Sequence, residues 1–245
     1  MNTTIAQLLE RKSVRRFSGE PVTQAEFHTV IECAMAAPTA GNMALYTIVN
    51  ITDQQVKDEL ADLCDNQPFI AKAPVVLLFL ADCRRWVDAF EVAGCQPHPP
   101  GPGDLYLGLC DALIAAQNAV TAAHALGLGS CYIGDIVEHR DRLVSLLDLD
   151  EYTFPATLLV LGHPSPHQRR PKPKRFPVSA ILRQERYRRL APDEQRAAFA
   201  ARGEDFDTFV PAFHDRKYAS AFEAELNAGV AAYLAPFLRT AKTEA

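Results

Sequence analysis

The sequence predicts a protein that combines helices and strands in one large domain with a long helical appendage. Its 245 residues suit a single domain, and 48% of them are hydrophobic, enough to bury a substantial core. Residues 74–81 form an apolar run without alternation, the pattern of a strand covered on both faces. Residues 104–126 read as a helix that is apolar on most faces and therefore buried. A buried strand and a buried helix together predict a layered α/β-type core.

The first third of the chain alternates helical patterns with apolar runs. Apolar side chains in residues 3–11 recur at helical spacing. Thr23 and Glu26 have the spacing of a capping box at the start of a second helix, which Pro38 ends. The further elements here are a turn of small residues at 36–42, an apolar run at 45–51 and an amphipathic helix at 53–63.

A segment rich in proline and glycine separates a short helical pattern at 84–90 from the longest one, at 104–126. Residues 94–103 contain four prolines and three glycines, which predict a surface loop or a lid over a pocket. Cys95 and His98 are metal-ligand types, but no second pair stands near them, so a metal site is not expected. Beyond the helix at 104–126, the expected elements are a strand at 130–133, a helix at 137–148, a strand at 156–162 and helical segments from 183 to 238.

Charge and cysteine usage exclude several classes of protein. The net charge of −5 argues against a general nucleic-acid surface, because such surfaces draw their affinity from clustered cations. The six cysteines are scattered and contain no C-x-x-C pair, which fits reduced thiols in a cytoplasm. The first residues lack the pattern of a signal peptide, and no window offers about 18 uninterrupted apolar residues. We therefore expect a cytoplasmic protein without a membrane span.

Two basic clusters favour a small anionic ligand. Residues 11–16 contain four cations with Ser13 between them, and arginine can bind a phosphate bidentately while serine adds a neutral donor. A second cluster, the proline-pinned arm at 168–175, follows the last expected strand. Taken alone, the first cluster is more often a solvated surface, and the second is equally compatible with a solvated connector. Their combination with the small-residue loop at 38–42 and the Gly turn at 132–135 makes a ligand site the stronger hypothesis.

Those parts match what a flavin mononucleotide needs. The cations suit its phosphate, the polar loop its ribityl hydroxyls, and the turn a backbone donor near N5. The common alternatives lack their motifs, since the chain has no G-x-G-x-x-G after a strand, no G-x-x-x-x-G-K-[ST], no H-E-x-x-H and no G-x-S-x-G. A nicotinamide nucleotide, if used, is therefore not held by a Rossmann fingerprint.

In order and spacing, these motifs resemble the FMN-dependent nitroreductase family, most closely its oxygen-insensitive NAD(P)H nitroreductase and flavin reductase branch. The resemblance implies an α+β fold: a three-layer sandwich with a mixed, mainly antiparallel sheet flanked by helices, in a domain-swapped homodimer with two flavin sites at its interface. It makes residues 1–182 the FMN-binding domain. Residues 183–245 would be a helical extension that packs on the dimer partner.

The resemblance also assigns roles to residues. Arg11, Ser13 and Arg15 match positions that hold the phosphate or ribityl chain, and Lys12 matches one near the pyrimidine ring. The loop that crosses the dimer interface corresponds to Pro38, Thr39, Gly41 and Asn42. Gln67 matches a position at the pyrimidine edge, and the turn facing N5 and O4 corresponds to Tyr132, Ile133, Gly134 and Asp135. Lys174 and Arg175 match the late phosphate-binding pair, with Lys172 as the alternative to Lys174.

The function implied is that of an FMN-dependent NAD(P)H oxidoreductase. It would reduce nitroaromatics, quinones or other electron-poor small molecules by ping-pong hydride transfer through flavin N5, without a catalytic side chain. The alternatives are an NAD(P)H:flavin reductase, a flavin dehydrogenase or dehalogenase for one metabolite, and a non-enzymatic flavin-binding redox sensor. Besides its own second copy and small acceptors, no nucleic-acid, membrane or metal partner is expected.

Two positions depart from the branch that the chain resembles. Asp135 stands where that branch often has glycine, so a carboxylate would lie beside the flavin edge. The pair Arg202-Gly203 is kept, but acidic residues at 204, 205 and 207 follow it where a cation would hold the 2′-phosphate of NADPH. A preference for NADPH is therefore not expected, and either NADH or NADPH can be the donor.

Overall fold

A computed structural model of the chain describes residues 2–167 and 171–240. It divides into two compact units, one of residues 1–169 with 226–245 and the other of residues 170–225, and we describe each by itself. The sequence prediction had its boundary at 182/183. That boundary stays a prediction. The end of the last helix belongs to the first unit, because it buries Tyr233 and Phe237 in the core of that unit. Packing of an extension on a partner subunit stays a prediction.

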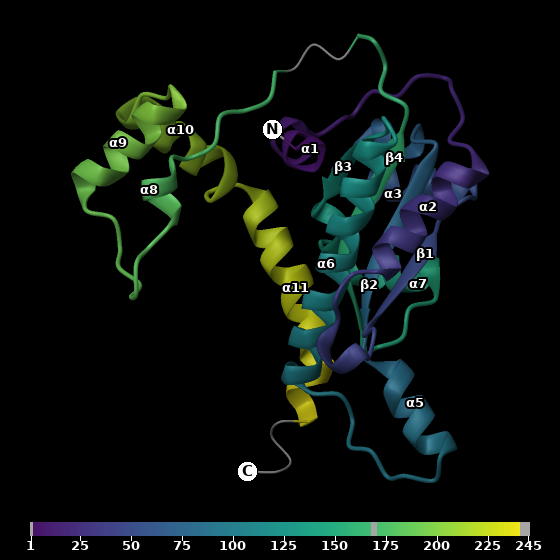
Figure 1. Ribbon diagram of the computed structural model, residues 1–245. Coiled ribbons are helices and arrows are strands. Elements are labelled where there is room, and N and C mark those ends of the chain that lie inside the picture. Colours follow the sequence, from purple (N-terminus) through teal and green to yellow (C-terminus); the bar gives the residue numbers. More distant parts are fainter. Residues whose placement is uncertain (1, 168–170, 241–245) are drawn as a thin grey trace. The chain divides into compact units, whose positions relative to one another are not determined.

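A four-stranded sheet forms the centre of the first unit (Figure 1). Its strands are β1 (Tyr46–Asn50), β2 (Val75–Asp82), β3 (Gly129–Ile133) and β4 (Thr153–Gly162). They lie in the order β1-β2-β4-β3, and every neighbouring pair is antiparallel. A parallel bridge between Ser13 and Ser130 adds the segment after the first helix to the β3 edge.

Helices cover both faces of this sheet. One face packs against α2 (Gln24–Met35) and α6 (Pro102–Ala125) through alternate residues of β2 such as Leu77 and Phe79. The other face packs against α3 (Gln54–Leu63), α4 (Pro68–Ala71), α7 (Arg140–Leu147) and α11 (Ala221–Thr240), through residues such as Leu78 and Leu158. Two separate cores on the two faces make three layers, which confirms the α+β sandwich that the sequence predicted.

The alanine content of α6 explains how it can lie close to the sheet. Ala112, Ala115, Ala116, Ala119 and Ala123 are each fully buried between α6 and the strands. Gly108 extends this row of small residues on α6. A Cβ at Gly108 would lie 3.1 Å from the Cβ of Ala81 on β2. Helix α6 is also the one helix of the described chain that is long and apolar enough to cross a membrane, and half of that apolar window is buried in the protein. A helix buried against a sheet accounts for this composition.

The remaining elements complete both units. In the first unit these are α1 (Thr3–Glu10), η1 (Ala40–Asn42), α5 (Arg84–Val92) and η2 (Asp135–Val137). The second unit contains α8 (Val178–Ile181), α9 (Pro192–Arg202) and α10 (Phe206–Lys217). Its centre is an aromatic cluster around the Arg202 guanidinium, which lies 4.3 Å from the ring centroid of Phe176 and 5.6 Å from that of Phe199. Residues 168–170 of the predicted basic arm lie outside the described residues.

The predicted capping box at the start of α2 is present and gives a pH-dependent expectation. The backbone N–H and hydroxyl of Thr23 each donate to Glu26 Oε2 at 2.8 Å. These bonds, with His163 nearby, hold the pKa of Glu26 below its usual value. A lowered folded-state pKa contributes stability above the unfolded-state pKa, and that stability is lost as the pH falls through the folded-state pKa.

We expect Glu26→Gln to lower the melting temperature at neutral pH, because the amide keeps the shape of the cap and loses the charge. The difference from the parent protein should shrink as the pH falls through the acidic range where Glu26 becomes protonated. Thermal unfolding followed by circular dichroism across that range measures it. Glu32→Gln, an exposed change on the same helix, is the matched control. A difference that stays constant with pH would contradict the role of the charge.

Candidate functional site

The segment after α1 lies directly beside β3. The Val14 N–H donates to the Ser130 carbonyl at 2.8 Å, and Phe17 forms a further bridge with Pro164. Gly129 permits this close approach, because a Cβ at Gly129 would lie 2.6 Å from the Val14 side chain. The buried Val14 therefore fixes the register of a segment whose neighbouring residues are Ser13 and Arg15.

Two arginines of this segment stack on aromatic rings. The Arg11 guanidinium lies 5.7 Å from the ring centroid of Tyr132 on β3, and that of Arg15 lies 5.8 Å from the ring of Phe69 on α4. Burial raises the pKa of Tyr132 to about 12, and Arg11 opposes this rise. Burial likewise raises the pKa of Cys131, against the influence of Arg15 and Ser13. The cations therefore gather around the end of β3.

A hydrogen bond joins two predicted site residues at the same end of the sheet. Gln67 is the N-cap of α4, and its Nε2 donates to Oδ2 of Asp135 in η2 at 2.5 Å. The carboxylates of Asp65, Asp135 and Glu138 all lie within 4.8 Å of one another. A negatively charged group thus borders the cationic one, and it fixes the orientation of the Gln67 amide.

The buried nitrogens of Arg11 test whether an anionic cofactor fits here. Nε and Nη2 of Arg11 are buried and have no hydrogen-bond partner in the described part of the chain. An unpaired buried donor of a charged group costs more than a neutral one, so such a guanidinium is suited to an anionic acceptor. A flavin phosphate meets this requirement, with Ser13 and Arg15 as further donors in the same segment. The residues present therefore fit FMN.

The loop at 38–42 is built differently from the segment at 11–17. It contains η1 and precedes β1, the opposite edge strand of the sheet from β3. Its backbone has positive φ angles at Gly41 (56°) and Asn42 (58°), a conformation that favours glycine and asparagine. Pro38 and Asn42 therefore lie beside β1, and within one chain this loop is at the other edge of the sheet from Arg11.

A buried aspartate on α6 holds this loop in place. Asp111 is 2% exposed, and its carboxylate accepts hydrogen bonds from the backbone N–H groups of Ala40 (3.0 Å) and Leu45 (3.1 Å). Thr39 Oγ1 accepts a third bond from Ala44, which also has a positive φ of 49°. The three bonds fix a loop of unusual backbone geometry. They also place the Thr39 hydroxyl inside the loop, where it is already bonded.

We expect Asp111→Asn to destabilise the protein by about 1–3 kcal/mol, the cost of one buried donor left without an acceptor. The amide keeps one oxygen for one N–H but presents its own N–H₂ to the other. Denaturant unfolding measures the change, and Glu32→Gln, an exposed change of a carboxylate to an amide in the same unit, is the control. Unchanged stability would mean that the two bonds at Asp111 contribute nothing to the loop.

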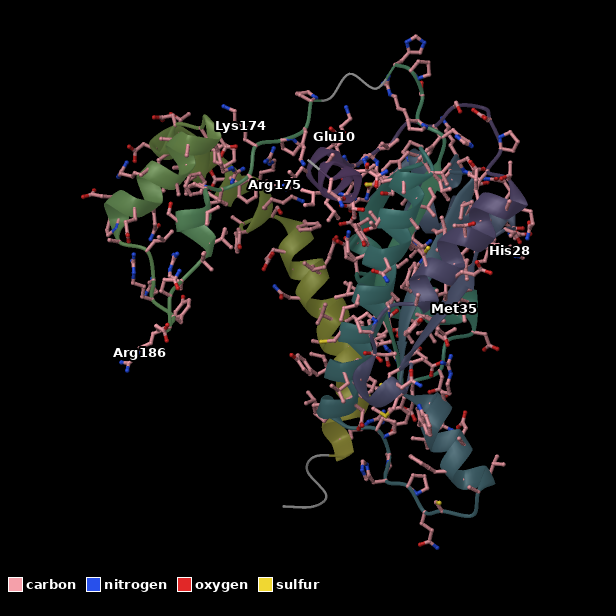
Figure 2. The ribbon with its side chains drawn as sticks, in the orientation of Figure 1. Glu10, His28, Met35, Lys174, Arg175 and Arg186 are labelled. Atoms are coloured by element: carbon pink, nitrogen blue, oxygen red, sulfur yellow. The ribbon has the colours of Figure 1, made fainter. Side chains whose placement is uncertain are left out.

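The structure thus brings one group of predicted residues together, and the remaining ones belong to the 38–42 loop and to the second unit. Arg11, Lys12, Ser13, Arg15, Gln67 and the 132–135 turn belong to one end of the first unit. Lys174 and Arg175 belong to the second unit, on the irregular segment that precedes α8 (Figure 2). There the Lys174 Nζ lies next to the Arg202-Gly203 turn, 3.6 Å from the position of a Cβ on Gly203.

The sequence indicated Phe69 as a residue of the pocket without its orientation, and it did not predict the roles of Cys131 and Asp111. Phe69 stacks on Arg15, Cys131 lies behind the cations, and Asp111 holds the loop. Asp111 left a visible signal, because a carboxylate in a helix that is apolar on most faces requires a buried partner. Cys131 left none, since a cysteine between apolar residues is ordinary core composition, and the orientation of Phe69 toward Arg15 could not be read from the sequence.

Comparison with known protein families gives the same assignment as the geometry. The model of the family described as the Nitroreductase family matches residues 8–163, which contain the sheet and all predicted site residues of the first unit. The chain belongs to the nitroreductase family. This confirms the resemblance that the motifs indicated.

Characterised relatives within the nitroreductase family cover most of the chain. An FMN reductase [NAD(P)H] of Bacillus subtilis is 34% identical over 212 residues, which are 86% of this chain and 84% of that protein. An oxygen-insensitive NADPH nitroreductase of Salmonella typhimurium is 32% identical over 191 residues, covering 78% and 77% of the two chains. The similarity therefore extends well beyond residue 182.

Solved structures of the family have the same fold. NfrA2 of B. megaterium has a TM-score of 0.78 and 30% identity, and the match covers 94% of this chain and 98% of that one. The NADPH:FMN oxidoreductase of Vibrio harveyi, solved in complex with NAD⁺, has a TM-score of 0.77 and 25% identity over 93% and 98% of the chains. The order and antiparallel pairing of the strands thus belong to a fold shared with flavin-dependent reductases.

Proposed function

We propose that this nitroreductase-family chain is an FMN-dependent NAD(P)H oxidoreductase that reduces electron-poor small molecules. The observation that carries the proposal is Arg11, whose buried nitrogens Nε and Nη2 have no hydrogen-bond partner among the described residues. Its guanidinium lies beside Tyr132, in a segment with Ser13 and Arg15. Relatives named as FMN reductases and as an NADPH nitroreductase support it. Nitroaromatics and quinones are the acceptor classes that we infer.

The chain's own residues bind and orient the cofactor. Arg11, Ser13 and Arg15 would hold the phosphate and ribityl chain, with Lys12 near the ring. Asp135 engages the Gln67 nitrogen and leaves the Gln67 carbonyl oxygen to accept a bond from the pyrimidine N–H. FMN, when bound, supplies the hydride chemistry at N5. The 133–135 turn would present its backbone N–H there, and no side chain needs to act as nucleophile or acid.

We infer a homodimer in which each site is completed by the partner. The loop containing Thr39, Gly41 and Asn42 lies beside β1, whereas the Arg11–Arg15 segment lies beside β3 at the opposite sheet edge. Their positions at different edges of one sheet support a site in which a second copy supplies the loop. Lys174 and Arg175 complete the phosphate site in this proposal. A cytoplasmic location fits the six free thiols.

Both NADH and NADPH can serve as the hydride donor, and we infer that the protein does not prefer NADPH. The Arg202 guanidinium is paired with Glu204 at 3.1 Å, and both side chains are about three quarters buried, 23% and 24% exposed. A guanidinium already bonded to a carboxylate is less available to a 2′-phosphate, and the carboxylate repels that group.

Glu204→Gln is expected to raise kcat/KM for NADPH by roughly tenfold, equivalent to about 1.4 kcal/mol, and to leave kcat/KM for NADH within about twofold. The amide removes the negative charge and keeps the size of the side chain. Steady-state rates with both donors at one fixed acceptor concentration measure the ratio. Glu185→Gln, an exposed change in the same unit, is the control. An equal change in kcat/KM for both donors would show that Glu204 does not determine the donor preference.

An anaerobic titration of the purified protein tests the proposed function directly. We expect the absorbance bands of bound flavin, bleaching by NADH or NADPH, and their return when a nitroaromatic or quinone is added. A colourless protein that stays colourless after reconstitution with FMN would refute the proposal. Bands that do not bleach would favour the flavin-binding redox sensor instead.

A second enzymatic candidate is the reduction of free flavin. The similarity to two proteins of Bacillus subtilis named as FMN reductases supports it. Rates with free FMN and with a nitroaromatic, compared at the same donor concentration, separate the two. A higher kcat/KM for free FMN would make flavin reductase the main activity. A flavin dehydrogenase or dehalogenase for one metabolite would show low rates with both.

A further inference from the structure

A cavity of about 400 Å³ lies in the first unit between α5, the proline-rich segment after it and the start of α6. The residues that line it include Met43, Trp86, Phe90, Cys95, His98 and Asp104. None of the residues assigned to the flavin is among them. The volume falls within the range of small-molecule sites, about 300–1,000 Å³.

Two aromatic side chains of α5 form one wall of this cavity. Trp86 and Phe90 are one helical turn apart, and their ring centroids are separated by 5.7 Å at an interplanar angle of 44°. They remain 37% and 42% exposed. The Trp86 indole N–H donates to the Met43 carbonyl at 2.8 Å, which fixes the orientation of the ring. A pair of oriented, exposed aromatic rings offers a surface on which a flat molecule can stack.

Residues of the 95–100 segment form a second wall of the cavity, and hydrogen bonds hold this segment in place without a ligand. The Cys95 N–H donates to the Phe90 carbonyl at 2.8 Å, and the Asp104 carboxylate accepts the Gly101 N–H at 2.8 Å. Prolines at 97, 99 and 100 restrict the backbone between these two bonds. A preformed wall lowers the ordering cost of binding.

The charge of the lining selects among ligands. Asp104 is the one carboxylate that lines the cavity, and among the described lining residues none is a lysine or arginine. An anionic ligand would therefore meet a like charge without a compensating cation. This is the reverse of the Arg11 site, where cations predominate.

We propose that this cavity binds a flat aromatic molecule that carries no negative charge. The site goes beyond the proposed flavin chemistry, because it needs neither the flavin residues nor the nicotinamide. Its lining is largely apolar and aromatic, and its polar members are Gln96, His98 and Asp104, of which Asp104 has one carboxylate oxygen bonded to the Gly101 N–H. These groups can accept or donate one or two hydrogen bonds and thereby orient a ring with a carbonyl or hydroxyl substituent.

Trp86 is the only tryptophan of the chain and lines this cavity, so tryptophan fluorescence responds to a ligand that binds there. We would titrate the purified full-length protein, with whatever flavin it carries, with coumarin and with coumarin-3-carboxylate, correcting for absorption by the probes. The two probes share a bicyclic ring and differ by a negative charge. Saturable quenching by coumarin is expected, with a Kd at least tenfold lower than that of the carboxylate.

Two variants localise and explain the binding. Phe90→Ala should weaken coumarin binding at least fivefold, whereas Tyr106→Ala, a change of an exposed aromatic on α6 outside the cavity, should leave it unchanged. Asp104→Asn should reduce the ratio between the Kd of coumarin-3-carboxylate and that of coumarin. Quenching that does not saturate, equal affinity for both probes, or equal loss in Phe90→Ala and Tyr106→Ala would each overturn the proposal. Flavin content, measured by absorbance, is independent of every one of these outcomes.

Discussion

A variant with both Arg11→Gln and Arg15→Gln is expected to be purified without bound FMN. A hydrogen bond to a charged group contributes about 1.5–3 kcal/mol, so the loss of both guanidiniums removes roughly 3–6 kcal/mol of binding free energy. That corresponds to an increase of at least about a hundredfold in the Kd for FMN. The two arginines lie on one short segment fixed by Val14 against β3, so glutamines would occupy the same places without charge.

The measurement is the ratio of flavin to protein after purification, followed by titration of the apoprotein with FMN while flavin fluorescence is recorded. Arg16→Gln is the matched control, because Arg16 belongs to the same basic run and lies outside the predicted site. Melting temperatures of the apoproteins show whether either variant is misfolded. One FMN per chain in the folded double variant would refute the assignment of Arg11 and Arg15.

The sequence predicted those elements whose chemistry is local. The capping box of Thr23 and Glu26 is formed by residues three apart, and the buried strand at 74–81 is marked by its own apolar residues. Both are present in the structure nearly where the pattern put them. The order of the strands is not local, and it came instead from the resemblance to a family.

Contacts between distant residues account for what the sequence did not predict. Phe69 meets Arg15, and Asp111 binds the backbone at Ala40 and Leu45, across 54 to 71 positions of chain. No periodicity records such pairs. The packing of α11 in the core of the first unit is a contact of the same kind, which a change of composition at 182/183 does not record.

The carboxylate at Asp135 shows how a departure from a family pattern acquires a physical role. The sequence indicated only that a negative charge would stand near the flavin edge. In the structure that carboxylate accepts a hydrogen bond from Gln67, so the same residue that adds charge also orients a predicted flavin contact. Asp135 therefore cannot be judged as an isolated replacement of glycine.

Gly229→Val is expected to lower the free energy of unfolding by about 3 kcal/mol or more. A Cβ at Gly229 would lie 2.0 Å from the Val137 carbonyl oxygen and 2.8 Å from that of Glu138, both of which are backbone atoms that cannot rotate away. Helix α11 would have to move, and with it Tyr233 and Phe237, which are 2% and 0% exposed. Overpacking of this kind commonly costs about 1–3 kcal/mol for a few added atoms. The melting temperature should fall by roughly 6–12 °C for a chain of this size.

The milder variant Gly229→Ala tests the sign of the effect. Helix propensity alone would make alanine more stable than glycine by about 1 kcal/mol in the interior of a helix. Close contact with the backbone at 137–138 predicts the opposite, a less stable protein. Ala228→Gly, at the exposed neighbouring position, gives the propensity term in the same helix without that contact. If Gly229→Ala proved as stable as the parent or more so, α11 would not be held against η2 as closely as the structure has it, and the large effect of valine would have no basis.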